Sequence, residues 1–129
     1  MDNKDIAKEW FDIADADLAS AKFLQKMRPI SLEIICYHCQ QAAEKYLKGF
    51  LVLQGEQVTK THDLTLLNEK CLNFDKDFKT VAGDCLMLTD YSVNVRYPFP
   101  LEITEKDMKL AIKSAIKIKD FVKEKVGGL

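Results

Sequence analysis

The stretch SLEIICYHCQQAAEKYLKGFLVLQG, residues 31–55, decides the fold because it predicts one long amphipathic helix. Its apolar residues recur at helical spacing. Ser31 and Gly55 are residue types that commonly begin and end helices. The small side chains of Ala42 and Ala43 would let a neighbouring helix come close. The expected buried stripe consists of Leu32, Ile35, Cys39, Ala42, Ala43, Tyr46, Leu47 and Phe50.

Apolar residues recur at helical spacing in four further segments: residues 4–26, 63–73, 75–95 and 104–126. Pro29 separates the first helix from the second because proline is unfavourable inside a helix. Tyr97 precedes a proline and should therefore end the fourth helix. Thr104 with Asp107 predicts a capping box at the start of the fifth. The pattern predicts an all-α, up-and-down bundle of four long helices plus one short helix.

The length and composition of the chain favour one domain, residues 1–129, of ordinary globular composition. The 129 residues are 47% hydrophobic and 30% charged, with 5 Gly and 3 Pro, and their formal charge is −1. This balance gives no global indication of nucleic-acid binding. No stretch approaches the roughly 20 apolar residues of a membrane span, and the polar N-terminus resembles no signal peptide. We therefore expect a cytoplasmic protein that does not enter a membrane.

Asp17 is a polar residue where the pattern calls for an apolar one. The predicted stripe of the first helix centres on Trp10, and Asp17 lies about 20° from it at 100° per residue. A buried carboxylate needs a cation or several hydrogen-bond donors. Asp17 is therefore either a core carboxylate satisfied by an arginine or a helix end, or part of a binding site.

Three polar side chains of the second helix, His38, Gln41 and Lys45, share one face beside the predicted core stripe. They form either a solvated face or a wet groove or subunit interface. The neighbouring Cys36 and Cys39 share another face, from which His38 points away. Because tetrahedral metal sites need converging ligands, we expect these cysteines to be core residues, and we expect no metal and no cofactor.

The stretch DYSVNVRYPFP, residues 90–100, places Arg96 at a helix end between Tyr91 and Tyr97. A guanidinium group can pair bidentately with a carboxylate or a phosphate. Asp17 is the internal candidate partner, provided that the first and fourth helices are neighbours. Alternatively, a nucleotide phosphate would occupy Arg96 while Tyr91 or Tyr97 stacks on a base.

Four segments, ADADLASAKFL, CYHCQQAAEKYLKGFLVLQG, THDLTLL and YSVNVRYP, occur in an order and at spacings that resemble prokaryotic HEPN-domain proteins. The resemblance extends from the first helix into the fifth. It implies a bundle of four or five helices that usually pairs as a homodimer. It also implies nucleotide binding beside a minimal nucleotidyltransferase, in some cases as toxin and antitoxin. Many relatives are metal-independent ribonucleases.

The resemblance assigns the family's polar pattern to six residues: Asp17, His38, Gln41, Glu44, Lys45 and Arg96. Ribonuclease-type members carry a histidine four to six residues after the arginine. Residues 97–102 contain no histidine. Metal-free RNA cleavage needs a base for the 2′-hydroxyl, so the sequence favours a protein without catalytic residues.

The main hypothesis is a non-catalytic homodimer that binds a nucleotide or RNA and serves a nucleotidyltransferase. Lys45 and Arg96 would hold phosphate, Tyr91 or Tyr97 would stack on a base, and Asp17 would orient Arg96. The imidazole of His38 would donate or accept a hydrogen bond across the polar face.

Two alternatives remain open. A divergent ribonuclease would use Arg96 for charge stabilisation and His38 as the base. A purely structural interaction subunit would keep Asp17 and Arg96 only as an internal ion pair.

Overall fold

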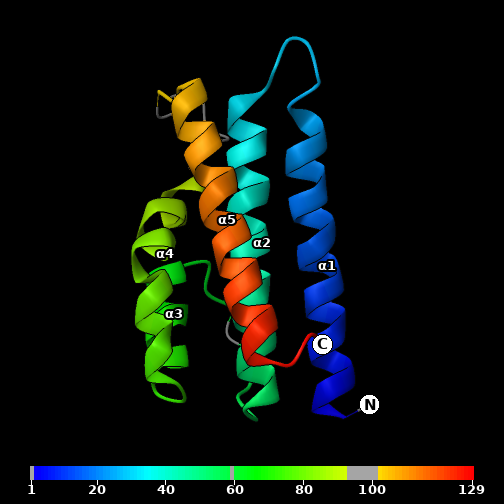
Figure 1. Ribbon diagram of the computed structural model, residues 1–129, viewed down its shortest axis with the longest axis vertical. Helices are drawn as coiled ribbons and strands as arrows, with labels where there is room; N and C mark the ends of the chain where they lie inside the picture. The colour runs from blue at the N-terminus through cyan, green and yellow to red at the C-terminus, as the bar shows by residue number, and fades with distance from the viewer. Residues whose placement is uncertain (1, 59, 93–101) are drawn as a thin grey trace.

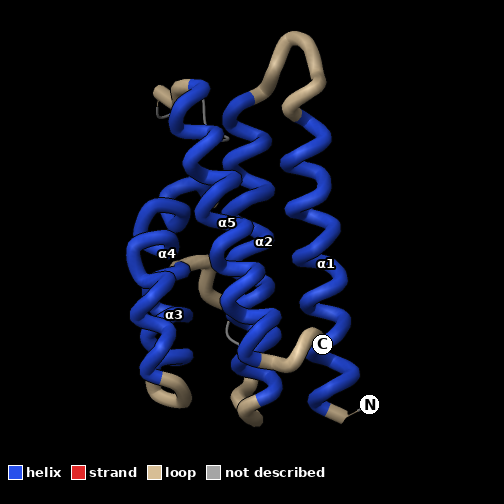
Figure 2. Tube along the Cα trace, viewed as in Figure 1, coloured by secondary structure: helices blue, strands red, loops and turns tan. Residues whose placement is uncertain are grey.

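The computed structural model describes residues 2–58, 60–92 and 102–129, and within them it contains helices and no strand (Figures 1 and 2). This confirms the predicted all-α fold. Five α-helices follow in order, with the 3-10 helices η1 and η2 on either side of the fourth. Their bounds are α1 (Asn3–Leu24), α2 (Leu32–Leu53), α3 (Leu64–Leu72), η1 (Lys76–Val81), α4 (Ala82–Leu88), η2 (Thr89–Tyr91) and α5 (Glu105–Lys125).

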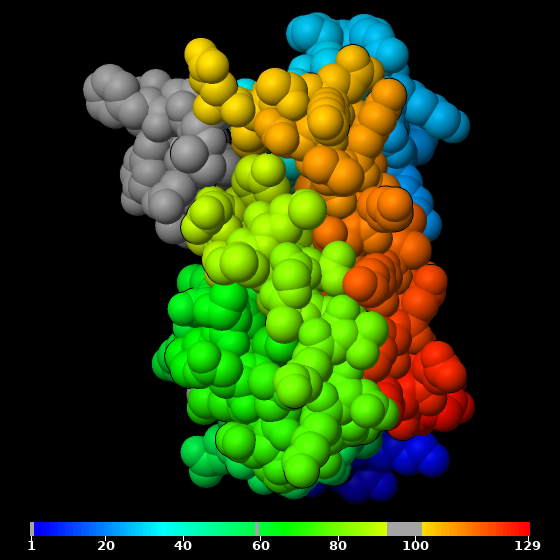
Figure 3. Space-filling view, turned by 60° about the vertical axis from the view of Figure 1, so that its left-hand side comes forward, coloured from blue at the N-terminus to red at the C-terminus, as the bar shows by residue number. Residues whose placement is uncertain are grey.

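The helices are arranged around α2, which lies in the middle of the molecule. In Figure 1, α1 forms one edge and runs beside α2, while α3 and α4 form the other edge. α5 packs against α2 and α4. Figure 3 shows the face on which α4, in yellow-green, lies beside α5, in orange and red. Because α1 is an edge helix whose main neighbour is α2, one side of it stays open.

The close approach of α1 to α2 depends on small residues, as the sequence predicted. The buried Ala42 shares the α2 face of Gly49, which lies against the ring of Phe11, whereas the buried Ala43 points about 120° away from it. The whole predicted stripe of α2 is buried except for Leu32, which is half-buried. The capping box of Thr104 and Asp107 is also present at the start of α5.

The orientation of α1 differs from the prediction. Its buried residues are Ala7, Phe11, Ala14, Leu18 and Ala21. Their mean direction lies about 60° from Trp10 at 100° per residue. Ile13 lies within about 60° of Trp10 and therefore on the predicted stripe, but it is 51% exposed. The helix turns Phe11 inward because Gly49 of α2 leaves room for its ring. As a result Asp17 lies at the edge of the buried stripe and not in its middle.

The predicted continuous helix over residues 75–95 is also wrong. The segment contains η1, α4 and η2 in succession up to Ser92, and residues 93–95 lie outside the described residues. The side chain of Asp75 accepts a hydrogen bond from the amide of Asp77, which starts the tighter 3-10 turn. Val81 has a non-helical backbone, and Gly83 adds a residue of low helix propensity. Val81, Cys85 and Leu88, which are apolar residues at helical spacing in this segment, are nevertheless buried.

Asp15 joins three helices at the edge of the buried stripe of α1 that lies opposite Asp17. Tyr46 of α2 donates a hydrogen bond of 2.5 Å to Asp15, and the ammonium group of Lys123 of α5 lies 3.1 Å from the same carboxylate. Burial acts to raise the pKa of Asp15. The hydrogen bond from Tyr46 and the charges of Lys123 and Lys119 outweigh it, so the pKa lies below its usual value.

Replacing Gly49 with alanine should destabilise the protein by about 1–3 kcal/mol, because the new Cβ would overlap the fully buried ring of Phe11. Gly83→Ala is the matched control, since Gly83 is also helical and has open space around it. The control should leave stability unchanged or raise it by about 0.5–1 kcal/mol. Urea denaturation measures both. Equal stability of the two variants would show that the α1–α2 contact is looser than described.

Asp15→Asn should destabilise the protein at neutral pH and much less in acid. Because the pKa of Asp15 is lower in the folded protein, its stabilising effect is full above the unfolded pKa of about 4 and disappears as the pH falls. Denaturation midpoints at pH 7 and pH 3 measure the difference. Asp12→Asn, whose carboxylate contacts only the exposed Lys8 among described residues, is the control. A loss of stability in Asp15→Asn that is the same at both pH values would contradict the stabilising role of the Asp15 charge.

Candidate functional site

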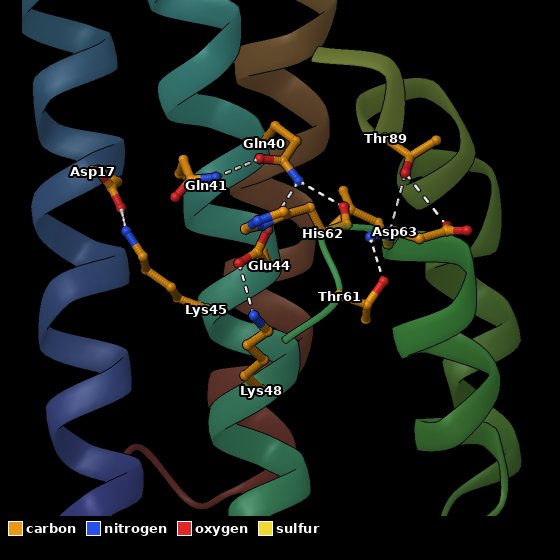
Figure 4. A network of polar contacts seen from close by, with 11 residues as sticks. Asp17, Gln40, Gln41, Glu44, Lys45, Lys48, Thr61, His62, Asp63 and Thr89 are labelled. Atoms are coloured by element: carbon orange, nitrogen blue, oxygen red, sulfur yellow. Dashed lines mark hydrogen bonds and ion pairs between the residues drawn. The ribbon is translucent and has the colours of Figure 1, made fainter. Parts of the chain in front are cut away.

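Three of the residues predicted to bind the nucleotide, namely Asp17, His38 and Lys45, meet where α1 packs on α2. The Nδ1 atom of His38 lies 3.1 Å from one carboxylate oxygen of Asp17, and the Nζ atom of Lys45 lies 2.5 Å from the other. Figure 4 shows the second contact between the two helices. All three side chains remain partly exposed, and His38 the most, at 26%. We call this partly exposed polar seam between α1 and α2 the groove.

Asp17 obtains its compensating charge from Lys45. A half-buried carboxylate requires such a partner, and both of its oxygens have one among the described residues. The sequence predicted Arg96 for this role. Arg96 and Tyr97 lie outside the described residues, so their assignment to the site stays a prediction.

Tyr91 does not lie with these three residues. It is half-buried in η2, and burial, with smaller contributions from Cys36 and Asp107, raises its pKa to about 12. Cys36 precedes His38 by two positions and therefore points about 160° away from it around α2. Tyr91 thus lies across α2 from the groove that contains His38.

Next to this cluster is an open hollow of about 460 Å³, lined by Ala19, Ser20, Phe23, Leu24 and His38. Phe23 is 69% exposed there. Because Nδ1 of His38 faces Asp17, the other ring nitrogen points away from the carboxylate. The hollow combines an imidazole, a hydroxyl and an exposed aromatic ring, and the ammonium group of Lys26 lies 5.9 Å from the centre of that ring. Such groups can hold a base and its phosphate.

A second polar cluster, of which the sequence analysis named only Glu44, lies about 90° around α2 from the first. It consists of Gln40, Glu44 and Lys48, which are buried, together with His62. Nζ of Lys48 lies 2.9 Å from one oxygen of Glu44, and Nδ1 of His62 lies 2.9 Å from the other. Gln40 donates to Glu44 at 3.2 Å. Gln40, Glu44 and Lys48 follow one another at positions i, i+4 and i+8 of an otherwise apolar helix, and this spacing could have predicted the cluster.

This second cluster fixes the loop between α2 and α3. Gln40 donates to the backbone carbonyl of His62 at 3.0 Å. Asp63 is the N-cap of α3, accepting hydrogen bonds from Thr65 and Leu66, and Thr89 accepts from the amide of Leu64 (Figure 4). Gln41 donates to Gln40 at 2.8 Å and so connects the groove side of α2 to the loop side. Since most of these groups are buried, the network is structural.

The four cysteines are free and buried, which confirms the prediction for Cys36 and Cys39. Burial raises the pKa of the Cys36 thiol to about 12. Among the residues that the structure describes, no group of three His, Cys, Asp or Glu side chains could hold a metal ion. In the same part of the chain, no helix is long and apolar enough to cross a membrane.

The chain belongs to the HEPN family, because the family model for the HEPN domain matches residues 7–125. The match includes the groove and the loop network. No curated protein matches the chain.

Two solved structures are similar to this chain over nearly their full lengths. The first is ST0689, described as an archaeal HEPN homologue, with a TM-score of 0.74 and 25% identity, covering 93% of this chain and 97% of that one. The second is TT1696 from Thermus thermophilus, with a TM-score of 0.71 and 25% identity, covering 92% of this chain and 97% of that one. Both support the helical arrangement described above.

Glu44→Ala should destabilise the protein by about 3–5 kcal/mol, because it leaves the buried ammonium group of Lys48 without its carboxylate. The double variant Glu44→Leu, Lys48→Met should recover much of this loss, since it removes both charges. Urea denaturation provides the measurement. Lys8→Ala, which breaks an exposed pair, should cost less than about 0.5 kcal/mol. If Glu44→Ala were as mild as Lys8→Ala, the cluster would not support the fold.

Proposed function

We propose that this chain is a binding protein of the HEPN family that holds the phosphate of a nucleotide or RNA at the α1–α2 groove and does not cleave it. The observation that supports this most is that His38 lines an open hollow with the exposed ring of Phe23, while Lys45 is held to the same Asp17 carboxylate as His38. A cation, an imidazole and an aromatic face together suit a nucleotide better than an apolar ligand.

Lys45 keeps donors for a ligand although it pairs with Asp17. An ammonium group has three N–H donors, and the contact with Asp17 needs one. Asp17 then holds Lys45 and His38 in place before the ligand arrives, which lowers the ordering cost of binding. Because Asp17 repels phosphate, the ligand phosphate would approach from the His38 side.

Stacking is assigned to Phe23 in this proposal, since Tyr91 lies across α2 from the groove. Phe23 lies on the exposed side of the hollow, where a base would cover it and reduce its contact with water. Arg96 is proposed as a second phosphate ligand and Tyr97 as a second stacking residue, on the family resemblance of the segment YSVNVRYP.

The partners are carried over from the resemblance. A minimal nucleotidyltransferase would act with this chain in the cytoplasm, as in toxin–antitoxin pairs of the family. The buried loop network at His62 supports a binding role in one respect, because it presents the groove on a rigid scaffold.

A second candidate function is a divergent metal-independent ribonuclease. The contact between Asp17 and Nδ1 of His38 favours it, because a carboxylate on one ring nitrogen orients an imidazole for proton transfer at the other. Residues 97–102 contain no histidine, so His38 would have to act as the base with Arg96 stabilising charge. Incubation with RNA in EDTA separates the two functions. If the unchanged protein cleaved RNA and both His38→Ala and Arg96→Ala lost this cleavage, the ribonuclease would be supported and the non-catalytic proposal refuted.

Lys45→Met should weaken binding of ATP or a short labelled RNA about tenfold, because it removes a charge-assisted contact to phosphate worth about 1.5 kcal/mol. Phe23→Ser should weaken binding to a similar extent through lost stacking. Fluorescence anisotropy at fixed salt measures the affinity.

Lys113→Met is the matched control for Lys45→Met. Lys113 is exposed on α5, away from the groove, and the substitution removes the same charge from the protein. Its affinity should equal that of the unchanged protein. No detectable binding of either ligand, or equal losses in both lysine variants, would contradict the site.

A further inference from the structure

An open cleft lies between α4 and α5, on the face that Figure 3 shows. Its main hollow has a volume of about 670 Å³. Four apolar side chains line it: Met87, Leu110, Ile116 and Phe121. Met87 is 39% exposed and Leu110 is 37% exposed, and the other two are half-buried. The chain therefore leaves apolar surface in contact with water between these two helices.

A second hollow continues the first toward the C-terminal end of α5. It has a volume of about 430 Å³ and reaches Lys125. Three residues line both hollows, which we together call the α4–α5 cleft: Thr80, Phe121 and Glu124. From Leu110 to Lys125 the cleft follows α5 for about 22 Å, at 1.5 Å per residue. A helix of about four turns has the same length.

Several polar groups of the α4–α5 cleft already have partners within the chain. The hydroxyl group of Ser114 donates a hydrogen bond of 2.8 Å to Asp84, and the ammonium group of Lys117 lies 3.1 Å from the same carboxylate. The ammonium group of Lys125 lies 2.5 Å from Asp77. Because both cations are paired with carboxylates, this surface suits an apolar partner better than a phosphate.

The charges that remain lie on the exposed side of α5. Among the charged side chains that line the cleft, three have no ion-pair partner within the described part of the chain: Lys113, Asp120 and Glu124. All three are exposed. Asp120 and Glu124 are four residues apart, so they lie one turn apart on the same side of the helix and repel each other. The C-terminal half of the cleft therefore has an excess of negative charge beside its apolar surface.

We propose that the α4–α5 cleft binds an amphipathic helix of a partner protein, with basic residues at one edge of its apolar face. Its apolar side chains would cover Met87 and Leu110, as helices do in hydrophobic grooves. Two lysine or arginine residues four positions apart would reach Asp120 and Glu124, because positions i and i+4 repeat the same one-turn spacing. A helix with carboxylates at those positions would be repelled, so the cleft selects a basic helix.

A second copy of the chain is a poorer occupant than a foreign helix. A two-fold axis would place the cleft of one copy over the same cleft of the other, and two facing hollows fill neither. Contact with a different face of the second copy would be head-to-tail, which continues into a filament unless it closes as a ring. The cleft shares no lining residue with the hollow at His38, so this inference does not depend on the proposed nucleotide site.

The charge preference is tested with two labelled synthetic peptides of about 15 residues, each a helix with a leucine face. One carries two lysines four positions apart beside the leucine face, and the other carries two glutamates there. In fluorescence anisotropy titrations the unchanged protein should bind the lysine peptide about tenfold more tightly than the glutamate peptide. The double variant Asp120→Lys, Glu124→Lys should reverse this preference.

The matched control is the double variant Asp5→Lys, Glu9→Lys, which makes the same charge change at the same spacing on the exposed side of α1. It should keep the preference of the unchanged protein. Equal behaviour of the two double variants, or no binding of the lysine peptide to the unchanged protein, overturns the proposal.

The apolar contact has a test of its own. Leu110→Gln should weaken binding of the lysine peptide about tenfold, because the bound helix would no longer bury a leucine side chain. Leu86→Gln is the matched control, since Leu86 is 65% exposed on α4 and lines neither hollow. Circular dichroism verifies that each variant is folded. Equal affinity of folded Leu110→Gln and Leu86→Gln overturns the docking site.

Sedimentation of the protein without peptide identifies the competing occupant. Leu110→Gln should have the same mass in solution as the unchanged chain, because no second copy covers the cleft. A change of mass in Leu110→Gln that is absent in Leu86→Gln would show that a second copy occupies the cleft, and the partner helix would be refuted.

Discussion

The structure depends on how closely α1 approaches α2. Gly49 has no side chain, so the ring of Phe11 occupies the space beside it, and this contact fixes the rotation of α1. At this rotation Asp15 reaches Tyr46 and Lys123 at one edge of the buried stripe, while Asp17 reaches His38 and Lys45 at the other. The same rotation leaves Ile13 51% exposed. The core and the polar groove therefore follow from one contact.

Burial separates the two polar clusters of α2 into different roles. Glu44 and Lys48 are almost wholly buried, which makes their ion pair part of the fold. Lys45 and His38 keep part of their surface exposed, and His38 also lines a hollow, which suits the binding role proposed for them. Gln41 connects the two sides through Gln40. A groove supported from behind by a buried network can hold its side chains in place without a ligand.

Much of the fold could be predicted from periodicity, because the stripe of α2 and the capping box of α5 are local patterns. The rotation of α1 could not, since Trp10 and Phe11 are adjacent aromatic residues and the choice between them is made by Gly49 on another helix. The meeting of Asp17 with His38 and Lys45 could not be predicted either, because it depends on how α1 packs against α2. Tyr91 was assigned to the site from its proximity in sequence to Arg96, which does not determine its side of α2.

The most direct test of the ligand site is a nuclear magnetic resonance titration of the protein with adenosine monophosphate, observing backbone amides and histidine ring protons. The account predicts that the largest shift changes fall on Ser20, Phe23, His38 and Lys45, with little change at His62. Shifts centred on α4 and α5, or none at saturating nucleotide, would contradict a binding site between α1 and α2.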